Sequence, residues 1–92
     1  MKISELRCGD ETETHIWSRH RVTLEEVHEA AFNHGLAIRG RSIGVYEVYG
    51  RTEAGRYLMI ALRGLGRSVL QLITAREMSE TERFRYRRYT AH

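Results

Sequence analysis

The chain has 92 residues, of which 41% are hydrophobic and 29% charged, with 15 basic and 12 acidic residues giving a net charge of +3. This length suits one domain, residues 1–92, and the composition argues against an intrinsically disordered chain. The single cysteine excludes an internal disulfide and favours a cytoplasmic location. The longest apolar run, residues 57–62, is too short to span a bilayer, and residues 1–10 carry no apolar core of a signal peptide.

Charge is distributed unevenly along the chain. Residues 1–35 hold four basic and seven acidic residues, a net charge of −3, whereas residues 36–92 hold eleven and five, a net charge of +6. Fourteen of the fifteen basic residues are arginine, which binds phosphate bidentately and stacks on bases. The second half is therefore a candidate nucleic-acid surface, although a solvated helix or sheet face gives the same pattern.

The first third of the chain predicts two short helices. Residues 10–20 form the first, with Asp10 as its N-cap and acidic residues in its first turn. Thr23 and Glu26 have the spacing of a capping box, in which each side chain bonds the other residue's backbone N–H. A second helix therefore begins directly after Thr23.

The middle of the chain predicts an antiparallel meander. Three segments rich in β-forming residues are separated by turns that contain glycine: residues 42–51, 57–65 and 68–74. Residues 57–62 are apolar on both faces, which predicts a central strand covered by helices. Residues 2–8 and 36–39 are candidate edge strands.

A third helix follows the meander. Ser79 and Glu82 have capping-box spacing, and the helix continues through Tyr89 with four arginines interleaved among its aromatic residues. The element order predicts an α+β fold: two short N-terminal helices, an antiparallel sheet of three to four strands, and a C-terminal helix.

Four segments, in chain order, resemble motifs of the BrnT-like group of RelE-type toxins. Trp17–Glu26 resembles that family's joint between helices, a lysine-histidine-glycine-valine run followed by two glutamates. Tyr49–Thr52 resembles its glycine-arginine step at a strand end, and Ile73–Arg76 its serine-alanine-arginine strand end. Glu82–Tyr86 resembles its closing glutamate-arginine-x-x-tyrosine helix. Together these motifs cover about residues 15–89.

The resemblance implies a RelE-like fold and a ribonuclease that inhibits translation. It also implies a ribbon-helix-helix antitoxin as partner, with a dimer or a hetero-oligomer with that antitoxin as the assembly. Arg19 and Arg21 stand where many relatives have lysine and glycine, and Lys2 is the only lysine in the chain. Without a catalytic lysine, a non-catalytic domain that binds RNA or the antitoxin, acting as a co-repressor, remains an alternative.

Metal-independent RNA cleavage needs a base, an acid and cations that stabilise the charge developing on the phosphate. Arg51 and Arg76 are the predicted catalytic cations because both lie at strand ends and match family motif arginines. Structural ion pairs with nearby glutamates are the alternative for both. His20 is the predicted acid or base, since its pKa suits proton transfer at neutral pH. Its alternative role is to close a helix by packing and hydrogen bonding.

Further residues are predicted to bind RNA by stacking or by contacting phosphate: Tyr49, Tyr57, Arg83, Tyr86 and Arg87. The tyrosines are equally suited to packing, and the arginines to a solvated helix face. No metal site is predicted, because the lone cysteine and scattered histidines give no pair at ligand spacing, and no cofactor motif is present. The competing hypotheses are a ribonuclease, an RNA-binding module and a repression partner.

Overall fold

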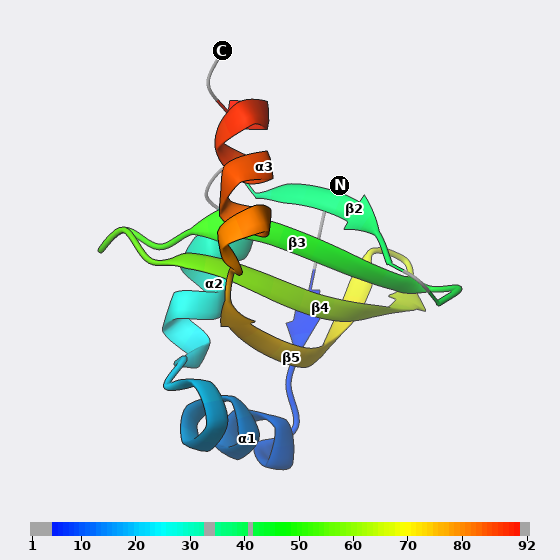
Figure 1. Ribbon diagram of the computed structural model, residues 1–92. Helices are drawn as coiled ribbons and strands as arrows, with labels where there is room; N and C mark the ends of the chain where they lie inside the picture. Colours follow the sequence, from blue (N-terminus) through cyan, green and yellow to red (C-terminus); the bar gives the residue numbers. More distant parts are fainter. Residues whose placement is uncertain (1–4, 33–34, 41, 91–92) are drawn as a thin grey trace.

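The structure is a computed structural model that describes residues 5–32, 35–40 and 42–90. The described residues form three helices and five strands in one sheet, with β4 at its centre and the strand order β1-β5-β4-β3-β2 (Figure 1). In chain order the elements are β1 Glu5–Arg7, α1 Asp10–His20, α2 Leu24–Phe32, β2 Leu36–Arg39, β3 Val45–Arg51, β4 Tyr57–Gly66, β5 Val69–Glu77 and α3 Glu80–Thr90.

The predicted α+β fold is confirmed, with two corrections to its sheet. The antiparallel meander is present as β3, β4 and β5, but the described sheet has five strands rather than three to four. It is also mixed, because β1 pairs in parallel with β5 while β2 pairs antiparallel with β3. No tight turn joins β1 to β5, so no local sequence pattern specifies the direction in which they pair.

The ends of α1 differ from the prediction at one point. Gly9 occupies the N-cap position and Asp10 is the first helical residue, without a side-chain capping bond. Asp10 instead contributes negative charge to the first turn, where the helix dipole favours it. At the other end Arg21 adopts a left-handed conformation, with φ at 53°, and its N–H bonds the carbonyl of Trp17. This is the position at which the BrnT-like motif has glycine, the residue best suited to that conformation.

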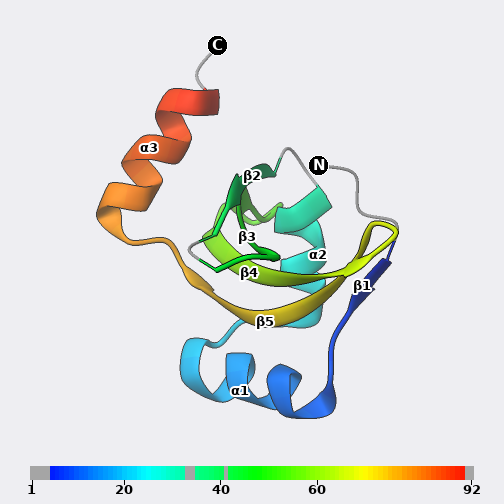
Figure 2. The ribbon, with the colours of Figure 1, turned by 90° about the vertical axis from the view of Figure 1, so that its right-hand side faces the viewer.

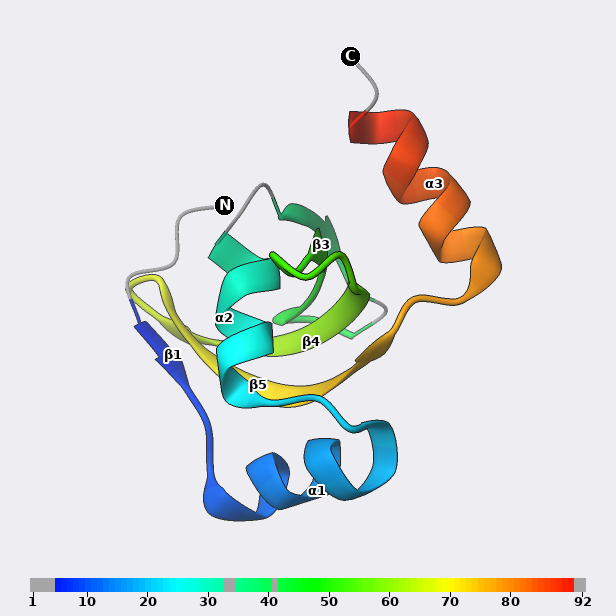
Figure 3. The ribbon, with the colours of Figure 1, turned by 90° about the vertical axis from the view of Figure 1, so that its left-hand side faces the viewer.

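The hydrophobic core lies between one face of the sheet and helices α1 and α2. Ile16, Val22 and Val27 from the helical part are fully buried against Leu58 and Ile60 of the central strand. Side chains alternate between the two faces of a strand, so Tyr57 and Met59 point to the opposite face. Helix α3 lies on that second face and projects away from the sheet, as Figures 2 and 3 show. Central strand β4 is thus covered closely on one face and only at one end on the other.

Gly50 sets the distance between α2 and β3. A Cβ atom at this position would lie 1.9 Å from the carbonyl oxygen of Ala30, a backbone atom of α2 that cannot move as a side chain does. Gly64, also in a strand, has room for a Cβ, since its nearest neighbour would be the ring of Tyr46 at 3.5 Å. The helix therefore packs on the sheet at a point that only glycine allows.

We expect Gly50→Ala to destabilise the fold by about 1–3 kcal/mol, since the added methyl group must push α2 away from the sheet. Gly64→Ala is the matched control because it adds the same group to a strand with ordinary van der Waals space. Unfolding in urea, monitored by circular dichroism, measures both. Equal stability of the two variants would contradict the close approach of α2.

Candidate functional site

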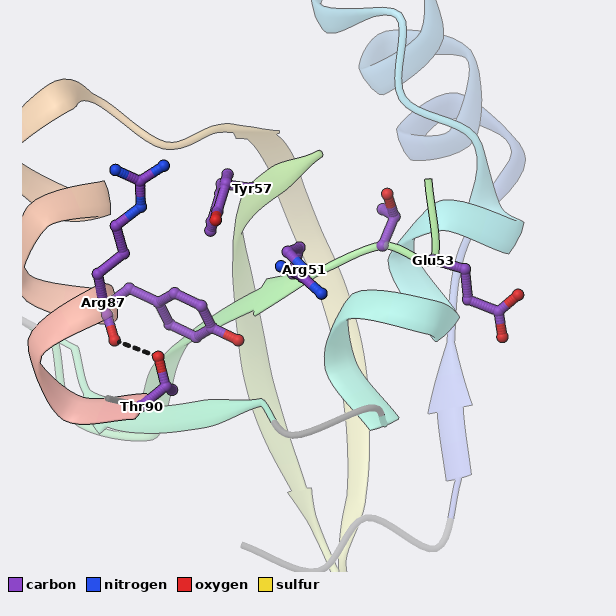
Figure 4. Close-up of a pocket in the computed structure, with 7 residues that line it drawn as sticks. Arg51, Glu53, Tyr57, Arg87 and Thr90 are labelled. Carbon is purple, nitrogen blue, oxygen red and sulfur yellow. Dashed lines mark hydrogen bonds between the residues drawn. The ribbon is translucent and has the colours of Figure 1, made fainter. Parts of the chain in front are cut away.

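A pocket opens between the second face of the sheet and α3 (Figure 4). Arg51 ends β3 and Tyr57 begins β4, and these two residues are direct partners across the strand pair. Helix α3 contributes Tyr86 and Arg87 to the opposite wall. The cavity volume is about 590 Å³, within the range of small-ligand sites. We call it the Arg51 pocket; its lining residues are Arg51, Thr52, Glu53, Tyr57, Tyr86, Arg87 and Thr90.

Two arginines and a tyrosine hydroxyl face one another in this pocket. Figure 4 shows Tyr57 between Arg51 and Arg87, while the carboxylate of Glu53 points away from them. Neither guanidinium forms an ion pair with a carboxylate of the described residues. Hydrogen bonding by Arg87, and then by Arg51, lowers the pKa of the Tyr57 hydroxyl below its ordinary value. The site thus combines two unpaired guanidinium groups with a tyrosine hydroxyl whose pKa is lowered.

The rest of the pocket wall is held in place by burial and hydrogen bonds. The Tyr86 side chain is buried and its ring meets that of Tyr57 edge-on at 5.9 Å. Thr90 donates its hydroxyl to the Tyr86 carbonyl at 2.9 Å, one turn earlier in α3. Thr52 is 2% exposed, and its hydroxyl accepts the backbone N–H of Arg56 at 3.0 Å. These contacts fix the backbone from which Arg51, Tyr57 and Arg87 extend.

Arg76 lies on the same sheet face but is engaged by α3. Its two terminal nitrogens bond the two carboxylate oxygens of Glu82 at 2.8 and 3.0 Å, in a bidentate pair. The same carboxylate accepts the backbone N–H of Ser79, whose hydroxyl accepts the N–H of Glu82, so the predicted capping box is confirmed. Tyr49 joins this network through its hydroxyl, which donates to Glu47 at 2.5 Å and lies 3.5 Å from Glu82. We call these contacts the Glu82 network.

The Glu82 network shifts the titration of its members. The hydrogen bonds from Arg76 are the largest cause that lowers the pKa of Glu82 to about 2. The pKa of Arg76 is raised, chiefly by the same hydrogen bonds, and burial raises that of Tyr49. At neutral pH the network therefore contains a charged pair and a neutral tyrosine. The partner of Arg76 is a glutamate of α3 rather than one of the neighbouring glutamates weighed from sequence.

His20 lies elsewhere, at the junction of α1 and α2. Its backbone carbonyl accepts a bond from Arg56 at 3.3 Å, and its ring packs edge-on against His15 at 6.0 Å. Arg56 also bonds both carboxylate oxygens of Glu26, the second glutamate of a confirmed capping box with Thr23. No described contact brings His20 to the Arg51 pocket. Arg56 was not among the residues predicted from sequence, although its partner Glu26 was indicated by the capping-box spacing.

Of the residues predicted from sequence, the Arg51 pocket brings together Arg51, Tyr57, Tyr86 and Arg87. Arg83 lies beside the same tyrosine, with its guanidinium carbon 5.8 Å from the Tyr57 ring centre. Within the described ranges, no group of three or more His, Cys, Asp or Glu residues is placed to hold a metal ion. No described helix has the length and apolar character needed to cross a membrane.

Comparison with solved structures identifies a similar fold. The chain superposes on the crystal structure of the Brucella abortus ribonuclease toxin BrnT with a TM-score of 0.71, over 86% of this chain and 100% of that one. Sequence identity over this match is 11%, so the similarity shows a BrnT-like fold and not a shared activity. No family model and no curated protein sequence matches the chain.

We expect Glu82→Gln to loosen the attachment of α3 by about 2 kcal/mol, because it removes the charge that pairs with Arg76. Trypsin digestion measures this release, since α3 contains four arginines and resists cleavage while it is folded on the sheet. Glu80→Gln is the matched control, an exposed glutamate in the same helical turn. Equal cleavage rates in the two variants would show that the pair does not anchor α3.

The same pair predicts how α3 responds to acid. A carboxyl group whose folded pKa is depressed contributes stability above its unfolded pKa and loses it as pH falls through the folded value. For Glu82 the loss runs from its ordinary value of 4.5 down to about 2. Hydrogen exchange of α3 amides should therefore accelerate over this range in the wild type, relative to Glu82→Gln. Parallel profiles in the two proteins would contradict the prediction.

Proposed function

We propose that this chain is a BrnT-like ribonuclease toxin that cleaves RNA in the Arg51 pocket and thereby inhibits translation. The observation that carries the proposal is the pair of uncompensated guanidinium groups, Arg51 and Arg87, on either side of the acidified Tyr57 hydroxyl. The pocket is large enough for one nucleotide unit, and its charge matches phosphate.

The proposed reaction is attack of a ribose 2′-oxygen on the adjacent phosphorus. The 2′-hydroxyl loses its proton, the new O2′–P bond forms, and the P–O5′ bond breaks. The leaving 5′-oxygen takes a proton from solvent water, and the products are a 2′,3′-cyclic phosphate and a 5′-hydroxyl. Arg51 and Arg87 would stabilise the charge that accumulates on the phosphate oxygens in the transition state.

Tyr57 is the proposed base for the 2′-hydroxyl. A tyrosine with a lowered pKa is deprotonated in a larger fraction of molecules than an ordinary tyrosine at the same pH, and the deprotonated form can accept the proton. Hydrogen bonding by Arg87, and then by Arg51, is the chief cause of that lowering, so the same two groups would serve the phosphate and the base. His20, as an acid or base, and Arg76, as a further cation, remain predictions from sequence, and neither lines the Arg51 pocket.

Two further features support the toxin proposal. The fold is similar to that of a ribonuclease toxin, and the sequence resembles BrnT-like motifs at the joint of α1 and α2 and at the strand end that carries Arg51. We accordingly propose a ribbon-helix-helix antitoxin as the protein partner, in a hetero-oligomer that holds the nuclease inactive.

One observation favours the alternative of a non-catalytic domain. Arg76, a predicted catalytic cation, is paired with Glu82 and does not line the Arg51 pocket, which therefore has fewer catalytic groups than the sequence suggested. A domain of this kind would bind RNA or the antitoxin and act as a co-repressor. Binding of RNA without any cleavage product would identify it.

Induced expression of Arg51→Ala should abolish growth arrest and RNA degradation that the wild type produces. Loss of one stabilising cation typically lowers the rate by about a hundredfold to a thousandfold. Arg63→Ala is the matched control, because Arg63 is an exposed arginine on the same sheet face and outside the pocket. A harmless wild type that leaves RNA intact would refute the nuclease proposal, and equal loss in both variants would refute the location of the site.

The proposed base predicts a pH profile. Cleavage should increase with pH as Tyr57 deprotonates, with a midpoint below that of an ordinary tyrosine. Arg87→Ala removes the largest cause of the lowered pKa, so its midpoint should move to higher pH as well as its rate falling. Cleavage of a short RNA by purified protein from pH 6 to 10 measures both. An unchanged midpoint in Arg87→Ala, or full activity in Tyr57→Phe, would exclude this role.

A further inference from the structure

A second pocket lies on the other side of Tyr57. Its volume is about 320 Å³, and Arg83 of α3 forms one wall. Tyr57 lines both this cavity and the Arg51 pocket, so the two cavities are neighbours. We call the second cavity the Arg83 pocket; its lining residues are Gly55, Arg56, Tyr57, Glu77, Met78 and Arg83.

The Arg83 pocket contains one guanidinium without an ion-pair partner among the described residues, that of Arg83. Arg56 is committed to the carboxylate of Glu26 at 2.9 Å, and its Nε lies 3.7 Å from the carboxylate of Glu77. Arg56 therefore partly offsets the negative charge of Glu77. Arg83 forms no ion pair with a carboxylate of the described residues and is exposed to solvent. A negatively charged ligand in this pocket would meet the guanidinium of Arg83 first.

Arg83 and Arg87 are positioned as a pair. They are four residues apart in α3, one helical turn, so their backbones are separated by about 6 Å along the helix. Their guanidinium carbons lie 5.8 and 5.2 Å from the centre of the Tyr57 ring. Contact with the ring restrains both side chains while leaving N–H donors for a ligand. The backbone separation of about 6 Å between Arg83 and Arg87 is comparable to the distance between successive phosphates in a single-stranded nucleic acid.

We propose that the Arg83 pocket binds a second phosphate of single-stranded RNA, next to the phosphate held in the Arg51 pocket. This inference rests on the proposed function, since it takes the Arg51 pocket as the position of the reacting phosphate. The strand would pass around Tyr57 with one phosphate on each side. Because both contacts are to phosphate, they would fix the position of the strand without reading its bases.

Binding of non-cleavable 2′-O-methyl oligonucleotides at low salt tests the proposal independently of cleavage. The wild type should bind a trinucleotide, with two internal phosphates, roughly tenfold more tightly than a dinucleotide with one. Arg83→Ala should remove that difference and leave dinucleotide binding unchanged. Its salt dependence for the trinucleotide should fall by about 0.7 in the slope of log K against log salt. Glu77→Gln should strengthen trinucleotide binding, because it removes a repelling charge.

Arg88→Ala is the charge-matched control, since Arg88 is exposed on the same helix and lies by Phe84, away from both pockets. Equal trinucleotide affinity in Arg83→Ala and Arg88→Ala, with dinucleotide binding still dependent on Arg51, would overturn the second subsite alone. Failure of the wild type to bind either oligonucleotide would overturn both this inference and the proposed function.

Discussion

The arrangement of this molecule depends on two glutamates that each perform two tasks. Glu26 and Glu82 are the last residues of capping boxes, and each carboxylate also accepts hydrogen bonds from an arginine. One terminal nitrogen of Arg56, in the turn before β4, bonds both oxygens of Glu26, and Arg76 of β5 forms a bidentate pair with Glu82. A cap alone fixes where a helix begins, but not where it lies relative to the sheet. The arginine supplies that second constraint. The sites are half-buried, so the pairs are screened less than surface pairs.

This constraint matters most for α3, which projects from the sheet and has a long exposed surface. Its first turn is held by the Arg76–Glu82 pair and its second by the burial of Tyr86 against Tyr57. Arg87 follows Tyr86 directly, so its position opposite Arg51 depends on that same attachment. Catalytic geometry requires side chains that are fixed before the substrate arrives. The Arg76–Glu82 pair therefore positions the part of the pocket wall that α3 contributes, although neither residue lines the pocket.

The features that were predicted from the sequence are those that depend on residues close together in the chain. Both capping boxes, the three-stranded meander and the α+β class depend on neighbouring residues, and all were predicted. The parallel pairing of β1 and the Arg56–Glu26 pair depend on contacts between distant segments, which spacing does not encode. The Arg76–Glu82 pair is closer in the chain, but it depends on how α3 turns back onto β5. The site shows the same division. Arg51, Tyr57, Tyr86 and Arg87 were predicted as separate candidates and share a pocket, whereas nothing in the sequence indicated that Arg76 would be engaged by α3.

This chain can share a BrnT-like fold at 11% sequence identity because the backbone requires a particular type of residue at only a few positions. Gly50 must lack a side chain for α2 to approach β3, and a left-handed residue must close α1, a conformation that Arg21 adopts at some cost in strain. Apart from these positions and the two glutamate–arginine pairs, the fold requires mainly that side chains on one face of each element be apolar, which many sequences satisfy. Activity is more demanding, because it needs particular groups at particular distances. A shared fold therefore supports the ribonuclease proposal less than the two uncompensated arginines beside Tyr57 do.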